Sequence, residues 1–481
     1  MKTTHLIFPC IMGAGVVAGC SHSGRQTDSR PNIIYILADD LGYGDLGCYG
    51  QTIIQTPHID QLAAEGMRFT RHYAGCTVSA PSRSSLVTGL HTGHTPVRGN
   101  KGHQPEGQHP QPGDTYTIGK MLKERGYVTG CFGKWGLGYP GSEGAPENQG
   151  IDEFFGLNCQ TLAHSYFPYY LWHNGDTVWL KGNEGFGMEE YAPDVIHREA
   201  MRFIRNHKER PFFAFLTYIL PHAELINPAD SIADIYSDRF PETPYHGVDS
   251  GPRYRKGPYA SSPHPKADFA AMVTRLDAYV GDIMAELKKS GSDRNTIVMF
   301  ASDNGPHREG GADPDFFGSY GPLRGVKRDL YEGGIRVPMI AWYPAKIKAG
   351  SVTDHVSAFW DVMPTLAELT GAKINGHTDG ISFAPAMYGQ SNQKKHDFLY
   401  WEFHEQNGKI AVLKGDWKAI WLNVNLPEKT VVELFDLSKD IHEDHNVAEQ
   451  YPEIVAGLEQ LMRQSHVDME AFPFSLPGKG K

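Results

Sequence analysis

Residues 31–38, Pro-Asn-Ile-Ile-Tyr-Ile-Leu-Ala, form a nearly continuous apolar run that ends at the carboxylates of Asp39 and Asp40. An apolar run of this length without alternation predicts a strand that is buried on both faces, as in the centre of a parallel sheet. Similar runs occupy residues 212–218 and 296–301. Because helical patterns separate these runs, we expect an α/β fold with a large mixed, mainly parallel sheet sandwiched by helices.

Four segments with helical periodicity alternate with the predicted strands, at residues 60–66, 118–125, 192–205 and 269–289. The last hundred residues have a different pattern. Short runs at 414–422 and 431–437 predict antiparallel strands, and a helix is expected from about 452 to 464. We therefore predict a main catalytic domain over residues 31–380 and a smaller C-terminal antiparallel-sheet subdomain over residues 381–481.

The N-terminus has the pattern of an export signal. Lys2 precedes an apolar run from Leu6 to Ala18, which is too short to span a bilayer, and Cys20 follows it. Val-Ala-Gly-Cys resembles a bacterial lipobox, in which the cysteine is acylated. We expect residues 1–19 to be a lipoprotein signal peptide and residues 20–30 a tether. The protein would then be an exported periplasmic or outer-membrane lipoprotein that meets the membrane only through its N-terminal lipid; the alternative is an ordinary signal peptide.

Composition narrows the choice of partners. Lys and Arg total 45 against 56 Asp and Glu, a net charge of −11, so the chain lacks the positive field that a nucleic acid requires. We expect no nucleic-acid partner. Four cysteines follow Cys20, at positions 48, 76, 131 and 159. Their spacing does not match a zinc site, and both buried thiols and one or two disulfides remain possible.

Two predicted strands end in oxygen-bearing side chains. Asp39 and Asp40 follow the first strand, and Asp303 and Asn304 follow the strand that begins near residue 296. If both strands belong to one parallel sheet, the four side chains meet at its carboxyl edge, where ligands bind in such sheets. Oxygen donors without histidine or thiolate favour Ca²⁺ or Mg²⁺. Asp and Asn are also common turn residues, so either pair alone would indicate no more than a turn.

A helix start near Ser79 predicts an anion site. Pro81 suits the first turn of a helix, which would place Ser79 at the N-terminus, where backbone N–H groups attract anions. Arg83, four residues later, would lie on the same face and present a guanidinium group. The alternative is a serine that caps the helix beside a solvated arginine.

The segment Ser79-Ala80-Pro81-Ser82-Arg83, followed by Thr88-Gly89, resembles the signature of the formylglycine-dependent sulfatases of the alkaline phosphatase superfamily, in its bacterial Ser-type carbohydrate branch. The resemblance extends in the family's order over nearly the whole mature chain. It includes residues 32–45, Gly133-Lys134-Trp135, Pro221-His222, residues 302–305, Arg324-Gly325-Val326-Lys327 and residues 331–338. It implies an alkaline-phosphatase-like fold and a sulfuric ester hydrolase.

The resemblance implies a nucleophile and a metal. Ser79 would be oxidised to formylglycine, whose hydrate has one hydroxyl to attack sulfur and a second to expel sulfate. Because position 79 is a serine, an anaerobic sulfatase-maturing enzyme would be the modifying partner. Asp39, Asp40, Asp303 and Asn304, together with residue 79, would bind one Ca²⁺.

Four further residues receive roles from the resemblance. Arg83 would orient the hydrate and offset its charge. Lys134 and Lys327 would hold the sulfate oxygens. His222 would protonate the leaving alcohol with help from Lys327.

One position departs from the family pattern. Many members have Gly-Lys-Trp-His-Leu-Gly, whereas this chain has Gly136 where the histidine would stand. That histidine normally contacts the formylglycine and is thought to assist sulfate release. A base from a neighbouring loop would have to replace it, or turnover would be slow; His91 and His94 are speculative candidates.

Substrate choice is expected to depend on loops. Four residues are candidate contacts to a sugar: His164, Trp172, His307 and Arg308. Two Gly/Pro-rich stretches are candidate substrate loops, at residues 139–150 and 241–265. By resemblance, the substrate would be a sulfated galactose or N-acetylgalactosamine of a host glycan, cleaved by an exo-acting enzyme at O4 or O6. The alternatives are a broad arylsulfatase, a phosphonate or phosphate ester hydrolase, and a lipoprotein that binds glycans without catalysis.

Overall fold

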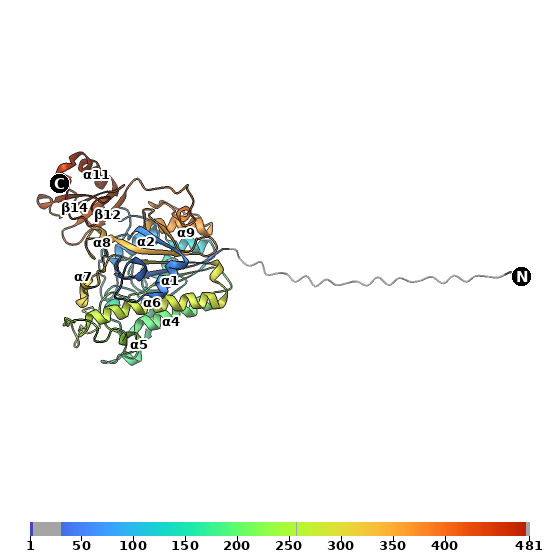
Figure 1. Ribbon diagram of the computed structural model, residues 1–481. Coiled ribbons are helices and arrows are strands. Elements are labelled where there is room, and N and C mark those ends of the chain that lie inside the picture. Colours follow the sequence, from blue (N-terminus) through green and yellow to red (C-terminus); the bar gives the residue numbers. More distant parts are fainter. Residues whose placement is uncertain (3–29, 256, 478–481) are drawn as a thin grey trace.

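The computed structural model describes residues 1–2, 30–255 and 257–477 (Figure 1). Cys20 and almost all of the predicted signal peptide and tether lie outside the described residues. Within the described parts of the chain, no helix combines the length and apolarity needed to cross a bilayer.

The main sheet has eleven strands in the described residues. Its centre is β1 (Asn32–Ala38), which lies between β7 (Phe212–Thr217) and β8 (Thr296–Ser302) and is parallel to both. These are the three apolar runs predicted from the sequence. The remaining strands are β2 (Met67–Tyr73), β3 (Val128–Lys134), β4 (Glu153–Leu157), β5 (Tyr170–His173), β6 (Asp176–Trp179), β9 (Arg336–Trp342), β10 (Ser351–Thr353) and β11 (Ser357–Ala358).

The strand order is β10-β2-β9-β8-β1-β7-β3-β4-β5-β6, and β11 pairs with β2. Strand β9 is antiparallel to β2 and β8, and β5 is antiparallel to β4 and β6. The other pairs are parallel, which confirms the predicted mixed, mainly parallel sheet. Trp172, a candidate sugar contact that we expected on a loop, lies on strand β5.

Helices cover both faces of the main sheet. One face packs against α1 (Pro57–Glu65), α4 (Ala192–Asn206) and α6 (Pro265–Ser290). The other packs against α2 (Ser79–Thr88), α3 (Ile118–Glu124) and α9 (Val362–Thr370). Shorter helices are α5 (Ser231–Asp234), α7 (Pro314–Phe317), α8 (Glu332–Ile335) and α10 (Ala384–Met387).

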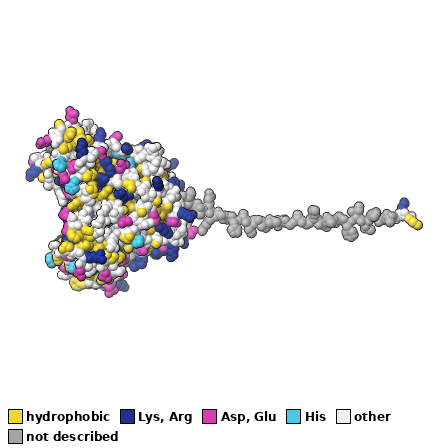
Figure 2. Space-filling model, viewed as in Figure 1, with side chains coloured by type: hydrophobic (Ala, Val, Ile, Leu, Met, Phe, Trp, Pro, Cys, Tyr) yellow, Lys and Arg dark blue, Asp and Glu magenta, His cyan; other side chains and the backbone are white. Residues whose placement is uncertain are grey.

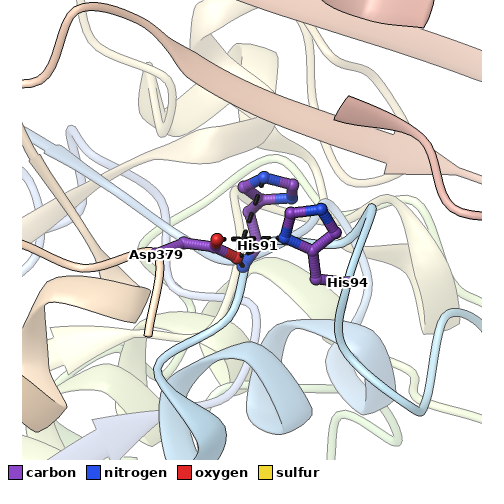
Figure 3. A group of neighbouring side chains, drawn as sticks. All are labelled: His91, His94 and Asp379. Carbon is purple, nitrogen blue, oxygen red and sulfur yellow. Dashed lines mark hydrogen bonds and ion pairs between the residues drawn. The ribbon is translucent and has the colours of Figure 1, made fainter. Parts of the chain in front are cut away.

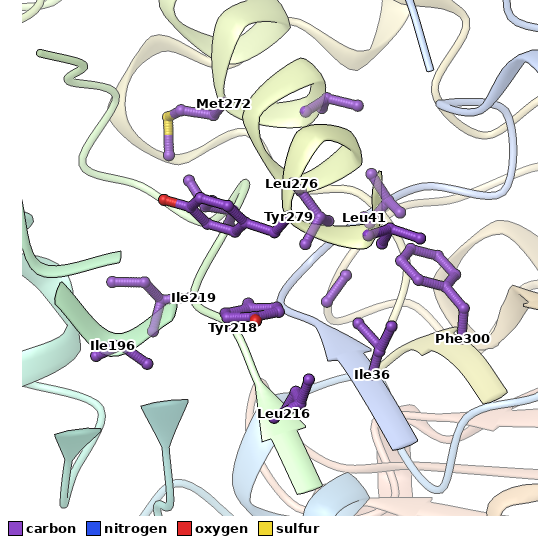
Figure 4. Packing of buried hydrophobic residues seen from close by; sticks show 14 of the residues in the cluster. Ile36, Leu41, Ile196, Leu216, Tyr218, Ile219, Met272, Leu276, Tyr279 and Phe300 are labelled. Carbon is purple, nitrogen blue, oxygen red and sulfur yellow. The ribbon is translucent and has the colours of Figure 1, made fainter. Parts of the chain in front are cut away.

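The core beneath α6 shows why the long apolar runs form the central strands. Figure 4 shows Leu276 and Tyr279 of α6 above Ile36 and Phe300, which belong to β1 and β8. All four side chains are buried. A parallel strand covered by helices on both faces needs apolar residues at successive positions, and this explains the missing alternation in the sequence.

The C-terminal part forms a separate antiparallel sheet of β12 (Leu399–Phe403), β13 (Lys409–Lys414), β14 (Trp417–Leu422) and β15 (Val431–Asp436). Helix α11 (Pro452–Ser465) packs against it, as predicted. The run at 414–422 was expected to be one strand. It contains a turn between β13 and β14, where Gly415 has a positive φ of 63°. The predicted division near residue 380 falls between α9 and β12.

The four described cysteines, Cys48, Cys76, Cys131 and Cys159, are free thiols, and all but Cys48 are buried. The sequence left open whether these cysteines are thiols or form disulfides, and the structure shows all four as unpaired thiols. On the face shown in Figure 2, acidic and basic side chains are interspersed over the surface.

Candidate active site

The carboxyl ends of β1 and β8 bring together the four oxygen-bearing residues predicted to meet there. The backbone N–H of Asp40 donates to Asp303 Oδ1 at 3.1 Å. Asn304 Nδ2 donates to Asp40 Oδ1 at 2.6 Å. Asp39, Asp40, Asp303 and Asn304 are fully buried. The predicted convergence at one edge of the sheet is confirmed.

These side chains fit a hard divalent cation. Asn304 Oδ1 is buried and has no hydrogen-bond partner among the described residues. Leaving a buried oxygen unpaired costs folding free energy unless a ligand contacts it. Burial and the neighbouring Asp39 carboxylate raise the pKa of Asp303 to about 6. Asp40 has a positive φ of 63°, a strained backbone that is common at functional sites. Oxygen donors alone favour Ca²⁺ or Mg²⁺ over zinc.

Ser79 is the first residue of α2, at the position predicted from Pro81. Its hydroxyl donates to Asp39 Oδ1 at 3.1 Å, and its side chain is buried. The next N–H, of Ala80, donates to Asn100 Oδ1 at 3.0 Å. The helix N-terminus therefore faces the carboxylate cluster, with the serine oxygen between the helix and Asp39.

Arg83 holds the cluster from the side of α2. Its Nε and one terminal nitrogen lie 3.1 and 2.9 Å from Asp303 Oδ2, and the other terminal nitrogen donates to the Lys134 carbonyl at 2.8 Å. The expected role was to orient the group at residue 79. In this geometry Arg83 orients Asp303, and it lies 3.4 Å from Asp39 Oδ2.

Two buried lysines complete the charged centre. Lys134 Nζ lies 2.6 Å from Asp39 Oδ2 and 3.2 Å from Ser79 Oγ. Lys327 Nζ lies 2.8 Å from Asp40 Oδ2. Burial alone would lower the pKa of Lys327, but Asp40 and Glu309 outweigh it and hold the pKa above its ordinary value.

His222 lies beside Lys327. Its Nδ1 bonds to the Ala223 carbonyl, which requires a proton on Nδ1 and leaves Nε2 as an acceptor for Lys327 Nζ at 3.2 Å. Burial and the charge of Lys327 lower the pKa of His222 well below its usual range. The ring stacks between His164 and His307, at centroid distances of 5.3 and 5.6 Å.

The charges of this centre indicate its ligand. The carboxylates of Asp39, Asp40 and Asp303 are matched by three buried cations, those of Arg83, Lys134 and Lys327. A divalent cation in the same cluster would leave an excess of two positive charges in a buried place. An anionic group with several oxygens, held against Ser79, would offset that excess.

Comparison with known proteins agrees with this geometry. The profile of the family described as Sulfatase matches residues 31–372. This chain belongs to the sulfatase family. A second profile, N-sulphoglucosamine sulphohydrolase, C-terminal, matches residues 325–468. The chain is a sulfuric ester hydrolase with an alkaline-phosphatase-like fold.

Three relatives illustrate the similarity. The N-acetylgalactosamine-6-O-sulfatase of Bacteroides thetaiotaomicron is 29% identical over 96% of this chain and 99% of that protein. Human arylsulfatase A is 32% identical over 91% of this chain and 88% of its own length. The crystal structure of Ps i-CgsB superposes with a TM-score of 0.75 at 30% identity, covering 90% of this sulfatase and 92% of that chain.

The departure at Gly136 has a structural counterpart in this sulfatase. Gly136 has a positive φ of 79°, and a Cβ built there would lie 2.8 Å from the side-chain amide nitrogen of Gln160. The amides of Gln160 and Asn158 are buried and have no hydrogen-bond partners among the described residues. Gln160 therefore fills the space next to residue 136, two positions after Lys134.

His91 and His94 do not replace the missing histidine. Figure 3 shows both rings around Asp379, with His94 Nδ1 2.9 Å from the carboxylate. The ten-residue helix α2, about 15 Å long, begins at Ser79, and His91 lies three residues beyond its other end. Their speculative assignment to the sulfatase reaction is therefore wrong, because the intervening helix separates them from the reaction centre.

Of the four candidate sugar contacts, His164 stacks on His222. Its Nδ1 donates to the Gly257 carbonyl at 2.7 Å, so Nε2 keeps a lone pair, and burial lowers the pKa of His164 to about 4. Trp172 donates from Nε1 to Glu106 at 2.9 Å.

The other two candidates, His307 and Arg308, contact other residues of the protein. His307 is buried behind His222 and contacts the Pro221 carbonyl and Glu309, an arrangement that disfavours direct contact with substrate. Arg308 forms an exposed ion pair with Asp315.

Sequence reasoning missed Glu309 and Gln160. Glu309 lies 3.6 Å from Lys327 and contacts His307 and Arg328. Although burial opposes it, the bond to His307 and the charge of Lys327 hold the pKa of Glu309 below its usual range. The position of Glu309 shortly after Asp303 was the feature of the sequence that could have indicated it. No feature of the sequence indicated Gln160, because its role depends on the backbone conformation at Gly136.

Proposed function

We propose that this sulfatase hydrolyses sulfate esters of carbohydrates with a formylglycine made from Ser79 and one bound Ca²⁺. The observation that carries the proposal is the position of Ser79 Oγ, at the N-terminus of α2 and within 3.2 Å of both Asp39 and Lys134. In the structure this serine oxygen stands for an oxygen of the formylglycine hydrate. The hydrate would supply one hydroxyl for attack on sulfur and another for the later release of sulfate.

The metal would be held by Asp39, Asp40, Asp303 and Asn304, with residue 79 beside them. Bound there, Ca²⁺ would polarise a sulfate oxygen and lower the cost of negative charge at the nucleophile. Arg83 keeps Asp303 ionised and in place, since two of its nitrogens hold the same carboxylate oxygen.

The chain's own cations would stabilise the transferred group. Lys134 Nζ, next to Ser79 Oγ, is placed to meet the sulfate oxygens as charge develops on them. Lys327 and His222 share one transferable proton through their 3.2 Å contact. We assign to this pair the protonation of the departing alcohol, with Lys327 holding the proton and His222 Nε2 accepting from it.

The names of relatives support a carbohydrate substrate. Besides the bacterial enzyme above, N-acetylgalactosamine-6-sulfatase of Canis lupus familiaris is 30% identical over 82% of this chain and 72% of that protein. Ps i-CgsB has been crystallised with a neocarrahexaose. We propose an exo-acting enzyme that removes sulfate from O4 or O6 of galactose or N-acetylgalactosamine in host glycans, with His164 in contact with the sugar.

The remaining proposals concern processing and location. The Ser79-Ala80-Pro81-Ser82-Arg83 segment supports maturation by an anaerobic sulfatase-maturing enzyme. The apolar run that ends at Cys20 supports an exported periplasmic or outer-membrane lipoprotein, attached by its N-terminal lipid.

The experiment is a substrate panel with the protein produced together with a maturing enzyme. Sulfate release is measured on mono-sulfated galactose and N-acetylgalactosamine, on an aryl sulfate and on the matching aryl phosphate, with Ser79→Ala as the control. We expect release from a sulfated sugar and none from Ser79→Ala. Preference for the phosphate would point to the phosphate ester hydrolase, aryl sulfate alone to a broad arylsulfatase, and sugar binding without release to a non-catalytic lipoprotein.

A further inference from the structure

A cavity of about 350 Å³ lies between the segments 102–107 and 161–170. Its lining includes His103, Glu106, Tyr170 and Arg255. None of these side chains was assigned a function above.

Two chain segments connect the cavity to the reaction centre. Asn100, just before the first lining segment, accepts a hydrogen bond from the Ala80 N–H beside Ser79. His164, in the second segment, stacks on His222. A ligand in the cavity would therefore be near a sulfate held at Ser79.

We propose that this cavity is a subsite for an uncharged sugar residue linked to the sulfated one, so that the enzyme recognises a glycan chain and not a single sugar. This inference rests on the proposed carbohydrate substrate. It is carried by a carboxylate of the wall with free acceptor positions and by an exposed aromatic ring that packs against a wall residue.

Two hydrogen bonds hold the carboxylate of Glu106 in place, but it can accept further hydrogen bonds. Trp172 Nε1 donates to Oε1 at 2.9 Å, and the Tyr170 hydroxyl donates to Oε2. An ionised carboxylate accepts about four hydrogen bonds, so each oxygen keeps an acceptor position. Sugar hydroxyls would supply donors for these positions. A second sulfate would be repelled by the same charge, which favours an uncharged residue in this subsite.

The aromatic ring is that of Trp179, on the edge strand β6. Its side chain is 56% exposed, and it pairs across the strands with Tyr170 of the cavity wall, at a centroid distance of 5.5 Å. An exposed tryptophan beside a polar cavity offers a flat apolar surface next to hydrogen-bonding groups. This combination suits a pyranose ring, which has C–H groups on its faces and hydroxyls at its rim.

Arg255 fixes the wall of the cavity. Its terminal nitrogens donate to the carbonyls of Phe167, Asn183 and Gly187 and lie 3.0 Å from the Tyr254 hydroxyl. Its guanidinium also lies 5.7 Å from the centre of the Tyr169 ring. Since these bonds occupy the terminal N–H groups, Arg255 orders the surrounding segments and leaves the ligand contacts to Glu106 and the aromatic rings.

The test compares two substrates that carry the same terminal sulfated sugar, a monosaccharide and a trisaccharide. We expect Trp179→Ala and Glu106→Gln each to lower kcat/KM for the trisaccharide roughly tenfold and to leave the monosaccharide unchanged. Phe186→Ala is the matched control, because Phe186 is 67% exposed but packs against Tyr254, and neither residue lines the cavity. It should change neither value.

Equal losses on both substrates, or no loss on the trisaccharide, would overturn the subsite. If the wild type releases sulfate from neither substrate, the proposed function itself has failed, and the subsite is decided by calorimetry with the unsulfated trisaccharide. Binding that Trp179→Ala weakens would support the subsite, whereas no binding to the wild type, or binding that Trp179→Ala leaves unchanged, would overturn it.

Discussion

Lys327 Nζ lies 3.2 Å from His222 Nε2, and the bond from His222 Nδ1 to the Ala223 carbonyl fixes the ring so that Nε2 is the acceptor. The transferable proton of the pair is therefore on the lysine. Because burial and Lys327 lower the pKa of His222 while Asp40 and Glu309 raise that of Lys327, the two groups keep this distribution at neutral pH.

The first prediction concerns the leaving group. Disrupting the pair of Lys327 and His222, to which we assign protonation of the departing alcohol, should matter more when that alcohol is a poor leaving group. We expect His222→Ala to lower kcat/KM by roughly 10²–10⁴ on a sugar sulfate and by much less on nitrophenyl sulfate, whose phenol leaves without protonation. Lys134→Ala is the comparison, because Lys134 contacts Ser79, and it should lower both values alike. Equal losses on both substrates for His222→Ala would contradict the assignment.

The second prediction concerns the metal. Three buried carboxylates and the unpartnered Asn304 Oδ1 should make Ca²⁺ a stabilising ligand of the folded state. Calorimetry should show that chelation lowers the Tm and that added Ca²⁺ restores it. At a hundredfold excess of Ca²⁺ over its Kd, the gain in free energy of unfolding should be about 2.7 kcal/mol. Asn304→Ala should shift this recovery to higher Ca²⁺ concentrations. Asn375→Ala, at an exposed position, should not. A Tm that is independent of Ca²⁺ would exclude the proposed ligand set.

The third prediction concerns Gly136. A histidine there would adopt a positive φ and meet the Gln160 amide, so Gly136→His should lower stability by roughly 1 kcal/mol and reduce activity. Combining it with Gln160→Ala removes the collision, and the double variant should be more active than Gly136→His. Gln160→Ala alone serves as the control. Higher kcat in Gly136→His alone would show that Gln160 does not occupy this space.

The fourth prediction concerns pH and a buried carboxylate of the C-terminal sheet. Glu402 accepts hydrogen bonds from His404 and His466, each at 2.7 Å, and from the Tyr400 hydroxyl. Although burial opposes it, the bonds from His404 and His466 lower the pKa of Glu402 from its ordinary 4.5 to about 2. The stabilisation is present above pH 4.5 and is lost as the pH falls toward 2. It amounts to about 3 kcal/mol.

His466 contributes in the opposite direction. Burial opposes its protonation, but the bond to Glu402 raises its pKa above the ordinary 6.5, so its contribution is complete below pH 6.5 and is lost at higher pH. The contribution of Glu402 and His466 to the Tm should be largest between about pH 4.5 and 6.5. Glu402→Gln should remove this dependence, whereas Glu428→Gln, at an exposed position, should keep it. The same pH profile in Glu402→Gln and the wild type would refute this account.

The sequence predicted the fold best where the apolar composition of a segment alone determines its structure. The apolar strands β1, β7 and β8 are buried on both faces, so their composition alone identifies them, and the polar residues that follow them must meet at one edge. Strand β2 was missed because Arg68, Thr70 and Arg71 interrupt its apolar pattern. The ion pair of Arg308 with Asp315 was not foreseen, because sequence proximity to Asp303 does not fix the direction of a side chain.

The central claim is that Ser79 becomes the nucleophile through oxidation to formylglycine. The most direct measurement is mass spectrometry of the peptide that contains Ser79, from protein produced with an anaerobic maturing enzyme, combined with sulfate release by the same sample. We predict the loss of two hydrogen atoms at Ser79 and an activity that increases with the converted fraction and disappears in Ser79→Ala. An unmodified serine in a fully active enzyme would contradict the account.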